Sequence, residues 1–512
     1  MQPPTQFLLL ENQLVEQLFD EKTPYTIHSD APRRQTITLL DTFDWRLHKM
    51  GWHLELRGKT LTLFMPDDTT FNQKITAAPP FRIEKPDTGA VTEKLAPVIQ
   101  MRALLAMGTC TETIIAHRML DDEQKTVVRL TEFHILPTCA TPRPATQHII
   151  KISPLKGYEK IANQIAKTVQ SQGAVPLDTP WWETVMRACG NPPGGYSSKI
   201  NVPLSPDMPA TVAVKMLLQH LLATMTTNLP YIAQDIDTEF LHDFRVAVRR
   251  TRAALSQLKD VLPAEDVARF KQDFSFVGKL TNRLRDLDVY LLAEPEYRRL
   301  LPNALRDGIS PLFAYLHAER ATALKQVSQS LNSARVKQIL SDWDDFLQSP
   351  PDADTTAHMT IGELARRRIY RRYKRLIKDG NRLLRSTDEA ALHRLRIDAK
   401  KLRYLLEFFA SLFPPKEMKS LIKQLKRLQD NLGDFNDLSV QSDFLLDVAL
   451  HAPPKKPWAN ETVLAIGCLL GISETKKEVE KSRFAKTFTT FAAPKNRARF
   501  KKLFAMPKDG TV

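Results

Sequence analysis

A strongly basic segment occurs twice in this sequence, with the same residue types at the same spacing. One copy starts at Leu241 and reads LHDFRVAVRRTRAAL, and the other starts at Leu392 and reads LHRLRIDAKKLRYLL. Both fit the pattern His-x-x-Arg-x-x-x-basic-basic-x-Arg, and corresponding residues lie 151 positions apart. The first row consists of His242, Arg245, Arg249, Arg250 and Arg252, and the second of His393, Arg396, Lys400, Lys401 and Arg403.

On an α-helix, these spacings place the cations of each row on one face. At about 100° per residue, four members of the first row fall within an arc of roughly 80°, and Arg250 flanks them. Apolar residues take the other side, namely Phe244, Ala247, Val248, Leu255 and Leu258 in the first copy and Leu395, Ala399, Leu402, Leu406 and Phe409 in the second. Like charges one turn apart repel each other. Such rows favour binding of a polyanion, with the histidines as donors; a solvated helix face is the structural alternative.

A second motif repeats with the same offset. Asp286 lies in the segment Arg-Asp-Leu, and Asp437 lies in the segment Asn-Asp-Leu 151 residues later. In both copies the aspartate follows the histidine of the basic row by 44 residues. Two motifs that keep their separation in both copies indicate a duplicated structural unit.

The net charge of +15 is concentrated in the C-terminal part of the 512 residues. Residues 1–200 carry 22 Lys and Arg against 21 Asp and Glu, whereas the remaining 312 residues carry 51 against 37. The positive field therefore belongs to the second part, which points to an anionic partner such as polyphosphate, nucleic acid or an anionic membrane surface.

The four cysteines and the N-terminus bound the class of protein. Cys110, Cys139, Cys189 and Cys468 show no C-x-x-C spacing, which argues against a zinc site and a disulfide framework and suits a reducing cytoplasm. The N-terminal apolar run covers only Phe7 to Leu10, too short for a secretory signal or a membrane span. We expect a cytoplasmic protein without membrane contact.

The pattern along the chain predicts an α+β protein in two domains. Residues 1–174 contain short alternating runs at 36–40, 53–57, 61–64, 127–130 and 148–152, typical of an antiparallel sheet, and a helical pattern at 157–172. Residues 175–208 are rich in Pro, Gly and Ser and are predicted as a linker, in which Trp181 and Trp182 form a packing patch against a neighbouring domain rather than a ligand platform. Residues 209–505 are helical by period, with one repeat at 209–346 and the other at 358–490.

The doubled motifs resemble the CHAD family, helical domains named for their histidines, over roughly residues 209–490. The resemblance implies two four-helix bundles related by a pseudo-twofold around a basic groove that binds inorganic polyphosphate without catalysis. It also implies association with polyphosphate granules. Both basic rows match the family's phosphate-contacting positions, and Asp286 and Asp437 are expected to orient or pair the arginines.

Other basic residues are weaker candidates for the same site. Lys279 and Arg283 precede Asp286 in the first copy, and Lys423, Lys426 and Arg427 precede Asp437 in the second. An exposed helix flank is the alternative for these five. The run Arg366, Arg367, Arg368, Arg371, Arg372, Lys374 and Arg375 has no equally basic counterpart in the first repeat, and it either extends the groove or forms an outward patch.

The N-terminal part resembles the CYTH triphosphate-tunnel family, which often precedes CHAD. The segments 40–47 and 51–57 carry this resemblance, which implies a tunnel domain that holds Mg²⁺ or Mn²⁺ on paired glutamates. Here the first strand reads Gln6-Phe7-Leu8-Leu9-Leu10-Glu11, and the late strand carries His148 and Lys151 instead of acids. Glu55, Glu84 and Glu132 alone make a poor metal cage. We therefore expect a degenerate domain with no metal, no cofactor and no catalysis, in which Arg57, Arg82, Arg118 or Arg129 still receive phosphates.

Three functions fit these observations. The first is binding of inorganic polyphosphate through the Arg rows, because guanidinium groups give bidentate, permanently charged donors. The second is an inorganic triphosphatase in which the C-terminal domain concentrates substrate. The third is a nucleic-acid-binding helical protein, for which Tyr370, Tyr373 and Tyr404 are the aromatic residues near the basic rows.

Overall fold

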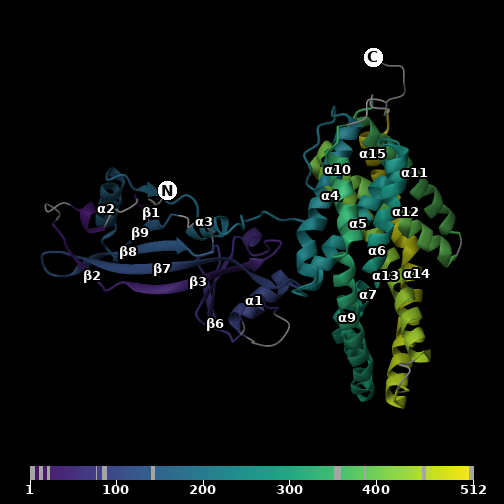
Figure 1. Ribbon diagram of the computed structural model, residues 1–512, viewed down its shortest axis with the longest axis horizontal. Helices are drawn as coiled ribbons and strands as arrows, with labels where there is room; N and C mark the ends of the chain where they lie inside the picture. Colours follow the sequence, from purple (N-terminus) through teal and green to yellow (C-terminus); the bar gives the residue numbers. More distant parts are fainter. Residues whose placement is uncertain are drawn as a thin grey trace. The chain divides into compact units, whose positions relative to one another are not determined.

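The computed structural model describes residues 6–10, 15–19, 24–76, 78–82, 89–139, 145–350, 359–385, 388–451 and 457–506. The chain divides into two compact units, Met1–Ser197 and Ser198–Val512. The first is built on a β-sheet and the second is helical (Figure 1). This arrangement confirms the predicted α+β class, an antiparallel sheet domain followed by a mainly helical region.

The sheet of the first unit has antiparallel pairing between its neighbouring strands throughout the described residues. Its strand order is β10-β1-β9-β8-β7-β3-β4-β5-β6, and β2 pairs with β7. The strands are β1 (Gln6–Leu8), β2 (Thr26–Ser29), β3 (Arg33–Thr42), β4 (His53–Arg57), β5 (Thr60–Phe64), β6 (Thr70–Lys74), β7 (Leu104–Leu120), β8 (Thr126–Pro137), β9 (Gln147–Pro154) and β10 (Val175–Pro176). The five strands predicted from alternation lie within β3, β4, β5, β8 and β9.

Helices cover the sheet and complete its cores. They are α1 (Ala90–Ile99), α2 (Glu159–Ser171) and α3 (Trp181–Ala188), with short 3₁₀ turns at Val15–Leu18 and His48–Met50. On β8, Leu130 belongs to the core formed with Phe7 and α2, whereas Ile135 belongs to the core formed with α3. Because side chains alternate along a strand, these two cores lie on opposite faces of β8 and β9.

The segment predicted as a linker contains helix α3, which packs within the first unit. Val185 and Met186 are buried against β7, and Trp182 stacks on His53 with ring centroids 5.2 Å apart. The two tryptophans therefore form part of the sheet domain's own packing.

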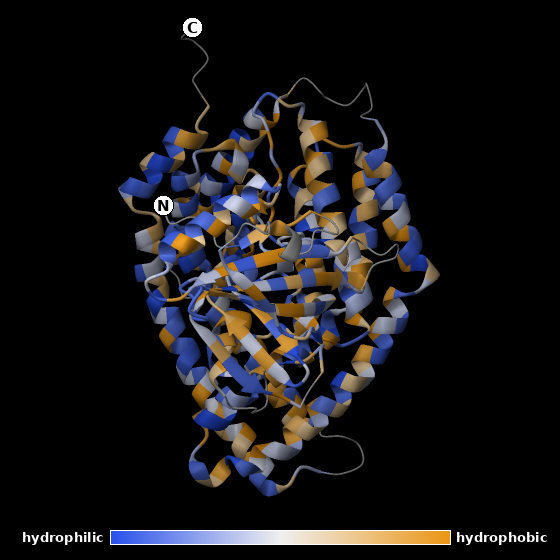
Figure 2. Ribbon diagram, turned by 90° about the vertical axis from the view of Figure 1, so that its left-hand side faces the viewer, coloured by the Kyte–Doolittle hydropathy of each residue, from blue (hydrophilic) through white to orange (hydrophobic). Residues whose placement is uncertain are grey.

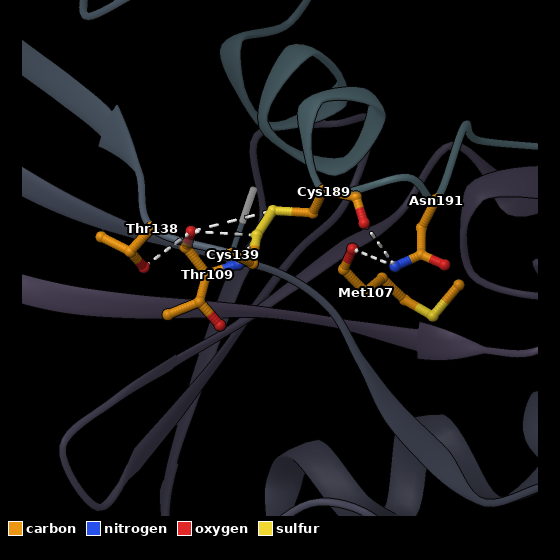
Figure 3. Close-up of a disulfide and its surroundings, with 6 residues drawn as sticks. All are labelled: Met107, Thr109, Thr138, Cys139, Cys189 and Asn191. Carbon is orange, nitrogen blue, oxygen red and sulfur yellow. Dashed lines mark hydrogen bonds between the residues drawn. A yellow bond between two sulfur atoms is a disulfide. The ribbon is translucent and has the colours of Figure 1, made fainter. Parts of the chain in front are cut away.

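The spacing of the cysteines argued against a disulfide framework, but two of the four are paired in the structure. Cys139, just after β8, and Cys189, at the end of α3, form a disulfide with Cα atoms 5.2 Å apart (Figure 3). Their sulfur atoms lie 3.5 and 3.9 Å from the carbonyl oxygen of Thr109 on β7. The pair is 50 residues apart in sequence and meets only because α3 folds back onto β7. Cys110 and Cys468 are free.

The second unit contains long helices in two consecutive sets, and its helices carry hydrophilic and hydrophobic residues in alternation along their length (Figure 2). The first set comprises α4 (Ala210–Ile232), α5 (Thr238–Gln257), α6 (Ala264–Leu280), α7 (Asn282–Leu292), α8 (Glu294–Leu300), α9 (Ser310–Leu331) and α10 (Ala334–Gln348). The second comprises α11 (Ile361–Leu383), α12 (Glu389–Phe408), α13 (Pro415–Leu450), α14 (Asn460–Phe491) and α15 (Pro494–Phe504). Short 3₁₀ turns lie at Asn303–Leu305, Asp307–Ile309 and Ala410–Leu412. Within the described residues, no helix combines the length and apolar character that crossing a bilayer requires.

The two basic rows lie on equivalent helices, α5 and α12. Each helix begins at an aspartate that accepts hydrogen bonds from the first turn, Asp237 for α5 and Asp388 for α12. These caps are also 151 residues apart and satisfy backbone N–H groups that would otherwise lack partners. The apolar residues predicted for the other side of each helix are all buried, from Phe244 to Leu258 at the C-cap of α5 and from Leu395 to Phe409 at the C-cap of α12. Burial of these faces turns the cationic faces outward.

Candidate functional site

The α5 and α12 helices contact each other within the helical unit, which brings residues of the two basic rows together. Both helices also contact the helices that carry the repeated aspartates, α7 for α5 and α13 for α12. The candidate site is therefore built from four helices, two from each repeat.

Arg245, on α5, is held by a break between α6 and α7. Its Nη1 donates to the carbonyl oxygen of Gly278 at 3.3 Å, the hydroxyl of Thr281 at 2.6 Å and the side-chain oxygen of Asn282 at 3.0 Å. All three acceptors are neutral. Burial and the nearby charge of Arg249 lower the pKa of Arg245 to about 10, although Asp286 opposes the shift. Its cationic state is thus electrostatically disfavoured in the free protein.

The second repeat holds its equivalent arginine differently. Because α13 continues through the position where the first repeat breaks, no helix end faces Arg396 among the described residues. Arg396 instead donates from Nη2 to Asp437 Oδ1 at 3.0 Å, and its side chain is 15% exposed whereas that of Asp437 is 63% exposed. His393 Nδ1 lies 2.7 Å from the side-chain oxygen of Asn436.

Lys400 marks the place where the two rows meet. Burial, followed by the charges of Arg396 on its own helix and Arg249 on α5, lowers the pKa of Lys400 to about 8. Arg403 adds to this shift, and Asp437 opposes it. The lowered pKa of Lys400 thus reflects its burial first, and then the positive potential of the neighbouring arginines. We call Arg245, Arg249, Arg396, Lys400 and Arg403 the central basic cluster.

Arg250 lies at the junction of the two repeats, where it shares Glu407 with Arg403 of the central basic cluster. It donates from Nη2 to Glu407 of α12 at 3.0 Å and from Nη1 to the carbonyl oxygen of Ser198 at 2.9 Å. Arg403 lies 3.5 Å from the same glutamate. Arg250 is only 15% exposed and is ion-paired, so its contacts link α5 to α12.

Lys401 also lies on another side of α12, next to Asp398 at 3.9 Å. Asp398 is buried and pairs with Arg372 at 3.0 Å and Arg375 at 3.3 Å, both from the basic run on α11. Part of this run lines a cavity of about 530 Å³ beside the end of α5, together with Lys259, Asp260 and Leu405. Arg368 forms an ion pair with Asp260 there. The α11 arginines thus form a second basic surface in which acids neutralise part of the charge.

The remaining predicted residues are scattered around these two surfaces. Arg252 lies against Gly278 of α6, and His242 is half-buried on α5. Asp286 is close enough to Arg245 for each to shift the pKa of the other, and burial raises the pKa of Asp286. Lys279 and Lys426 are exposed, and Arg283 pairs with Glu319 at 3.0 Å. Arg427 lines a hollow between α13 and α14.

Sequence comparison of the repeats missed several residues that shape the cluster. Arg285 lowers the pKa of Arg245 but corresponds to Asn436 in the second copy. Comparing the two copies therefore does not identify Arg285 as a site residue. Three further residues contact the arginines of the first row, and no such contact is repeated among the described residues of the other copy. They are Thr281 and Asn282 at the helix break and Glu407 at the repeat junction.

The first unit has a cavity of about 690 Å³ on the α3 side of the sheet, where Glu55, Arg57, Glu112 and Lys151 meet. Arg57 pairs with Glu55 at 2.8 Å and with Glu112 at 2.6 Å. Burial lowers the pKa of Arg57, but the two glutamates outweigh that and raise it. Gln6 lines the cavity from β1. Glu11 and Glu84 lie outside the described residues.

Comparison with known proteins gave no match among curated sequences. Among solved structures, the CHAD domain from the plant Ricinus communis is 24% identical with a TM-score of 0.49, covering 58% of this chain and 96% of that one. PptA from Streptomyces chartreusis is 15% identical with a TM-score of 0.45, covering 55% and 100%. The model of the CHAD domain family matches residues 216–446, which hold both basic rows and both repeated aspartates. The helical unit of this chain therefore contains a CHAD domain.

Proposed function

We propose that the helical unit binds inorganic polyphosphate on the surface where α5 and α12 meet, and that the protein acts by binding rather than by catalysis. The observation that carries the proposal is the convergence of cations from both repeats at Lys400, whose pKa is lowered to about 8 partly by charges from α5 and α12. Such a cluster is costly until an anion neutralises it.

The chemistry of the cluster suits a linear phosphate chain. Arg245 and Arg249 are one helical turn apart on α5, and Arg396, Lys400 and Arg403 follow each other at similar steps on α12. One turn advances about 5 Å along a helix axis. Guanidinium groups can bind phosphate oxygens through two hydrogen bonds each, and Lys400 adds a point charge between the rows.

Burial of two of the three tyrosines near the basic rows favours polyphosphate over nucleic acid, whereas the third, Tyr370, is only partly buried. Tyr373 and Tyr404 are only 5% and 9% exposed. Tyr373 stacks on Phe500, with ring centroids 3.8 Å apart. Non-specific binders of single-stranded nucleic acid use aromatic side chains as stacking platforms. These two rings are packed in the core and do not offer a face on which a base could stack. Contacts with phosphate groups therefore remain the main source of affinity.

The first unit supports binding rather than triphosphate hydrolysis. Activation of water by Mg²⁺ or Mn²⁺ needs carboxylates that are free to hold the ion. In the described part of the cavity, Arg57 pairs with both Glu55 and Glu112, and Gln6 lies on the first strand. We infer that this domain has lost catalysis and retains at most anion contacts through its basic residues.

The proposal is tested by competition in the full-length protein. Long-chain polyphosphate and single-stranded DNA are titrated at matched phosphate concentration and salt, and polyphosphate should bind more tightly. Its affinity should fall steeply with salt as counterions are released.

Arg249→Glu should weaken polyphosphate binding by about tenfold or more, because the new carboxylate repels the chain at short range. Lys325→Glu, at an exposed position on α9, makes the same change in net charge and should change little. Equal losses in both variants would mean a diffuse surface field, and the proposed site would be wrong.

A further inference from the structure

A cluster of histidines around one glutamate lies in the sheet of the first unit, apart from both basic surfaces. Glu132 and His134 are two residues apart on β8, and His148 is directly opposite His134 on β9. Opposite residues on antiparallel strands have Cβ atoms about 5 Å apart. The rings of His134 and His148 accordingly have centroids 4.0 Å apart.

The polar atoms of these three residues converge. Among the residues that the structure describes, Glu132, His134 and His148 each offer one ligand atom, and these atoms all lie within 4.8 Å of one another. Glu132 Oε1 is 2.7 Å from His134 Nε2. A Zn²⁺ ion with bonds of about 2.0–2.1 Å holds tetrahedral ligands about 3.3 Å apart. Side-chain rotation alone can therefore close the cluster around an ion, because the strand register already fixes the backbone.

A fourth residue, His117, orients the carboxylate of Glu132 through the oxygen that His134 does not contact. His117 Nε2 on β7 lies 3.1 Å from Glu132 Oε2, and its Nδ1 lies 2.8 Å from the hydroxyl of Ser29 on β2. Burial opposes ionisation of Glu132, but the hydrogen bond from His117 and the charge of His134 lower its pKa. Metal-binding carboxylates are commonly held in this way by a second set of hydrogen bonds.

This cluster is distinct from the cavity of the first unit. Side chains alternate across β8 and β9, so Glu132, His134 and His148 lie on the face that carries Leu130 and Ile150. The cavity is lined instead by Phe133 and Ile149 from the opposite face. The pairing of Arg57 with Glu55 and Glu112 in the cavity therefore says nothing about this second place.

We propose that Glu132, His134 and His148 form a site for a divalent transition metal of the zinc type. Two imidazole nitrogens and one carboxylate suit Zn²⁺, whereas Mg²⁺ prefers oxygen ligands alone. Glu132 is 3% exposed, and His134 is 24% exposed. The ion can thus enter from the His134 side, and a solvent molecule can complete its coordination.

The test uses metal-free, full-length protein without a histidine tag. Zn²⁺ is titrated against a chromophoric chelator, and Co²⁺ is added separately to record its visible absorption. We expect one Zn²⁺ per chain at this site, a Co²⁺ spectrum with nitrogen ligands, and no competition from Mg²⁺. His134→Asn and His148→Asn should each lower Zn²⁺ affinity by about tenfold or more, since each removes one ligand.

His28→Asn is the matched control, because His28 is an exposed histidine on β2 of the same sheet. Zn²⁺ should raise the melting temperature of the wild type and of His28→Asn but not of the two ligand variants. Circular dichroism before metal addition establishes whether each variant is folded, and two separate ligand variants guard against the misfolding of one. Wild-type protein without saturable Zn²⁺ binding, or folded ligand variants that bind as tightly as the wild type, would overturn the proposal.

Discussion

Polyphosphate binding should depend on pH through Lys400. In the free protein its pKa is about 8, lowered by burial and by Arg396 and Arg249. A bound phosphate chain supplies the anion that counters these charges and returns the pKa toward the ordinary value of 10.5. Above pH 8 the free protein must therefore take up a proton in order to bind. Affinity is full below this pH and is lost as the pH rises through it.

The size of the effect follows from linkage. At about pH 7 nearly all Lys400 side chains are protonated, and at about pH 9 roughly one in ten is. If the bound lysine stays protonated throughout, affinity falls by about tenfold between these two values, which is about 1.4 kcal/mol. The expected slope reaches at most one proton, because Arg245, with a pKa of about 10, titrates mainly above this range.

The assay is a binding titration at constant ionic strength from about pH 7 to pH 9, with calorimetry in two buffers to count protons. Lys400→Arg is the informative variant, because a guanidinium stays charged throughout this range. It should bind within a few-fold of the wild type at about pH 7 and lose the dependence on pH. Other groups that titrate in this pH range are the same in the wild type and in Lys400→Arg. A flat wild-type profile, or a fall that persists in Lys400→Arg, would refute the reasoning.

Two further outcomes follow from the contacts of single residues. Arg250→Ala should lower the free energy of unfolding by about 1–3 kcal/mol, measured by chemical denaturation, because it leaves Glu407 without its partner across the repeats; its effect on polyphosphate affinity should be smaller than that of Arg249→Glu. Phosphate release from tripolyphosphate with Mg²⁺ or Mn²⁺ should stay at background, because Arg57 occupies Glu55 and Glu112. Metal-dependent turnover that Glu55→Gln abolishes would contradict this expectation.

Sequence alone predicted most of the helical unit because duplication supplies an internal comparison. The apolar faces of α5 and α12 follow from helical spacing, and every residue assigned to them is buried. Spacing could not decide which members of a row share one surface. Arg250 and Lys401 flank the rows at the edge of the helical arc, and their direction is set by Glu407 and Asp398. Tertiary packing brings Glu407 of α12 to Arg250 of α5, whereas Asp398 lies one turn before Lys401 on the same helix.

Features that differ between the two repeats could not be predicted by comparing the two copies of the sequence. The break at Thr281, which gives Arg245 its neutral acceptors, has no counterpart in the continuous helix α13.

In the sheet domain, Cys139 and Cys189 meet across 50 residues, and His117 meets Glu132 across β7 and β8. Such contacts depend on strand register and on how α3 folds back, and neither leaves a local pattern in the sequence.

The ion pair between Arg396 and Asp437 raises the question of whether the aspartate orients the arginine or competes with the ligand. Asp437 Oδ1 accepts from Arg396 at 3.0 Å, yet 63% of the Asp437 side chain is exposed and can turn toward solvent. A pair of this kind, in which only the carboxylate is exposed, is worth about 0.5–1 kcal/mol. Because a phosphate chain must displace or repel this carboxylate, we expect that Asp437→Asn binds polyphosphate about two- to fivefold more tightly.

Asp447→Asn is the matched control for this change. Asp447 lies on the same helix, is 70% exposed and pairs with His451, so its replacement alters the net charge equally. A titration at low salt should show tighter binding for Asp437→Asn and no change for Asp447→Asn. Tighter binding in both variants would reflect net charge alone. Weaker binding in Asp437→Asn alone would mean that the carboxylate holds Arg396 in its binding position, because a competing carboxylate can only reduce affinity.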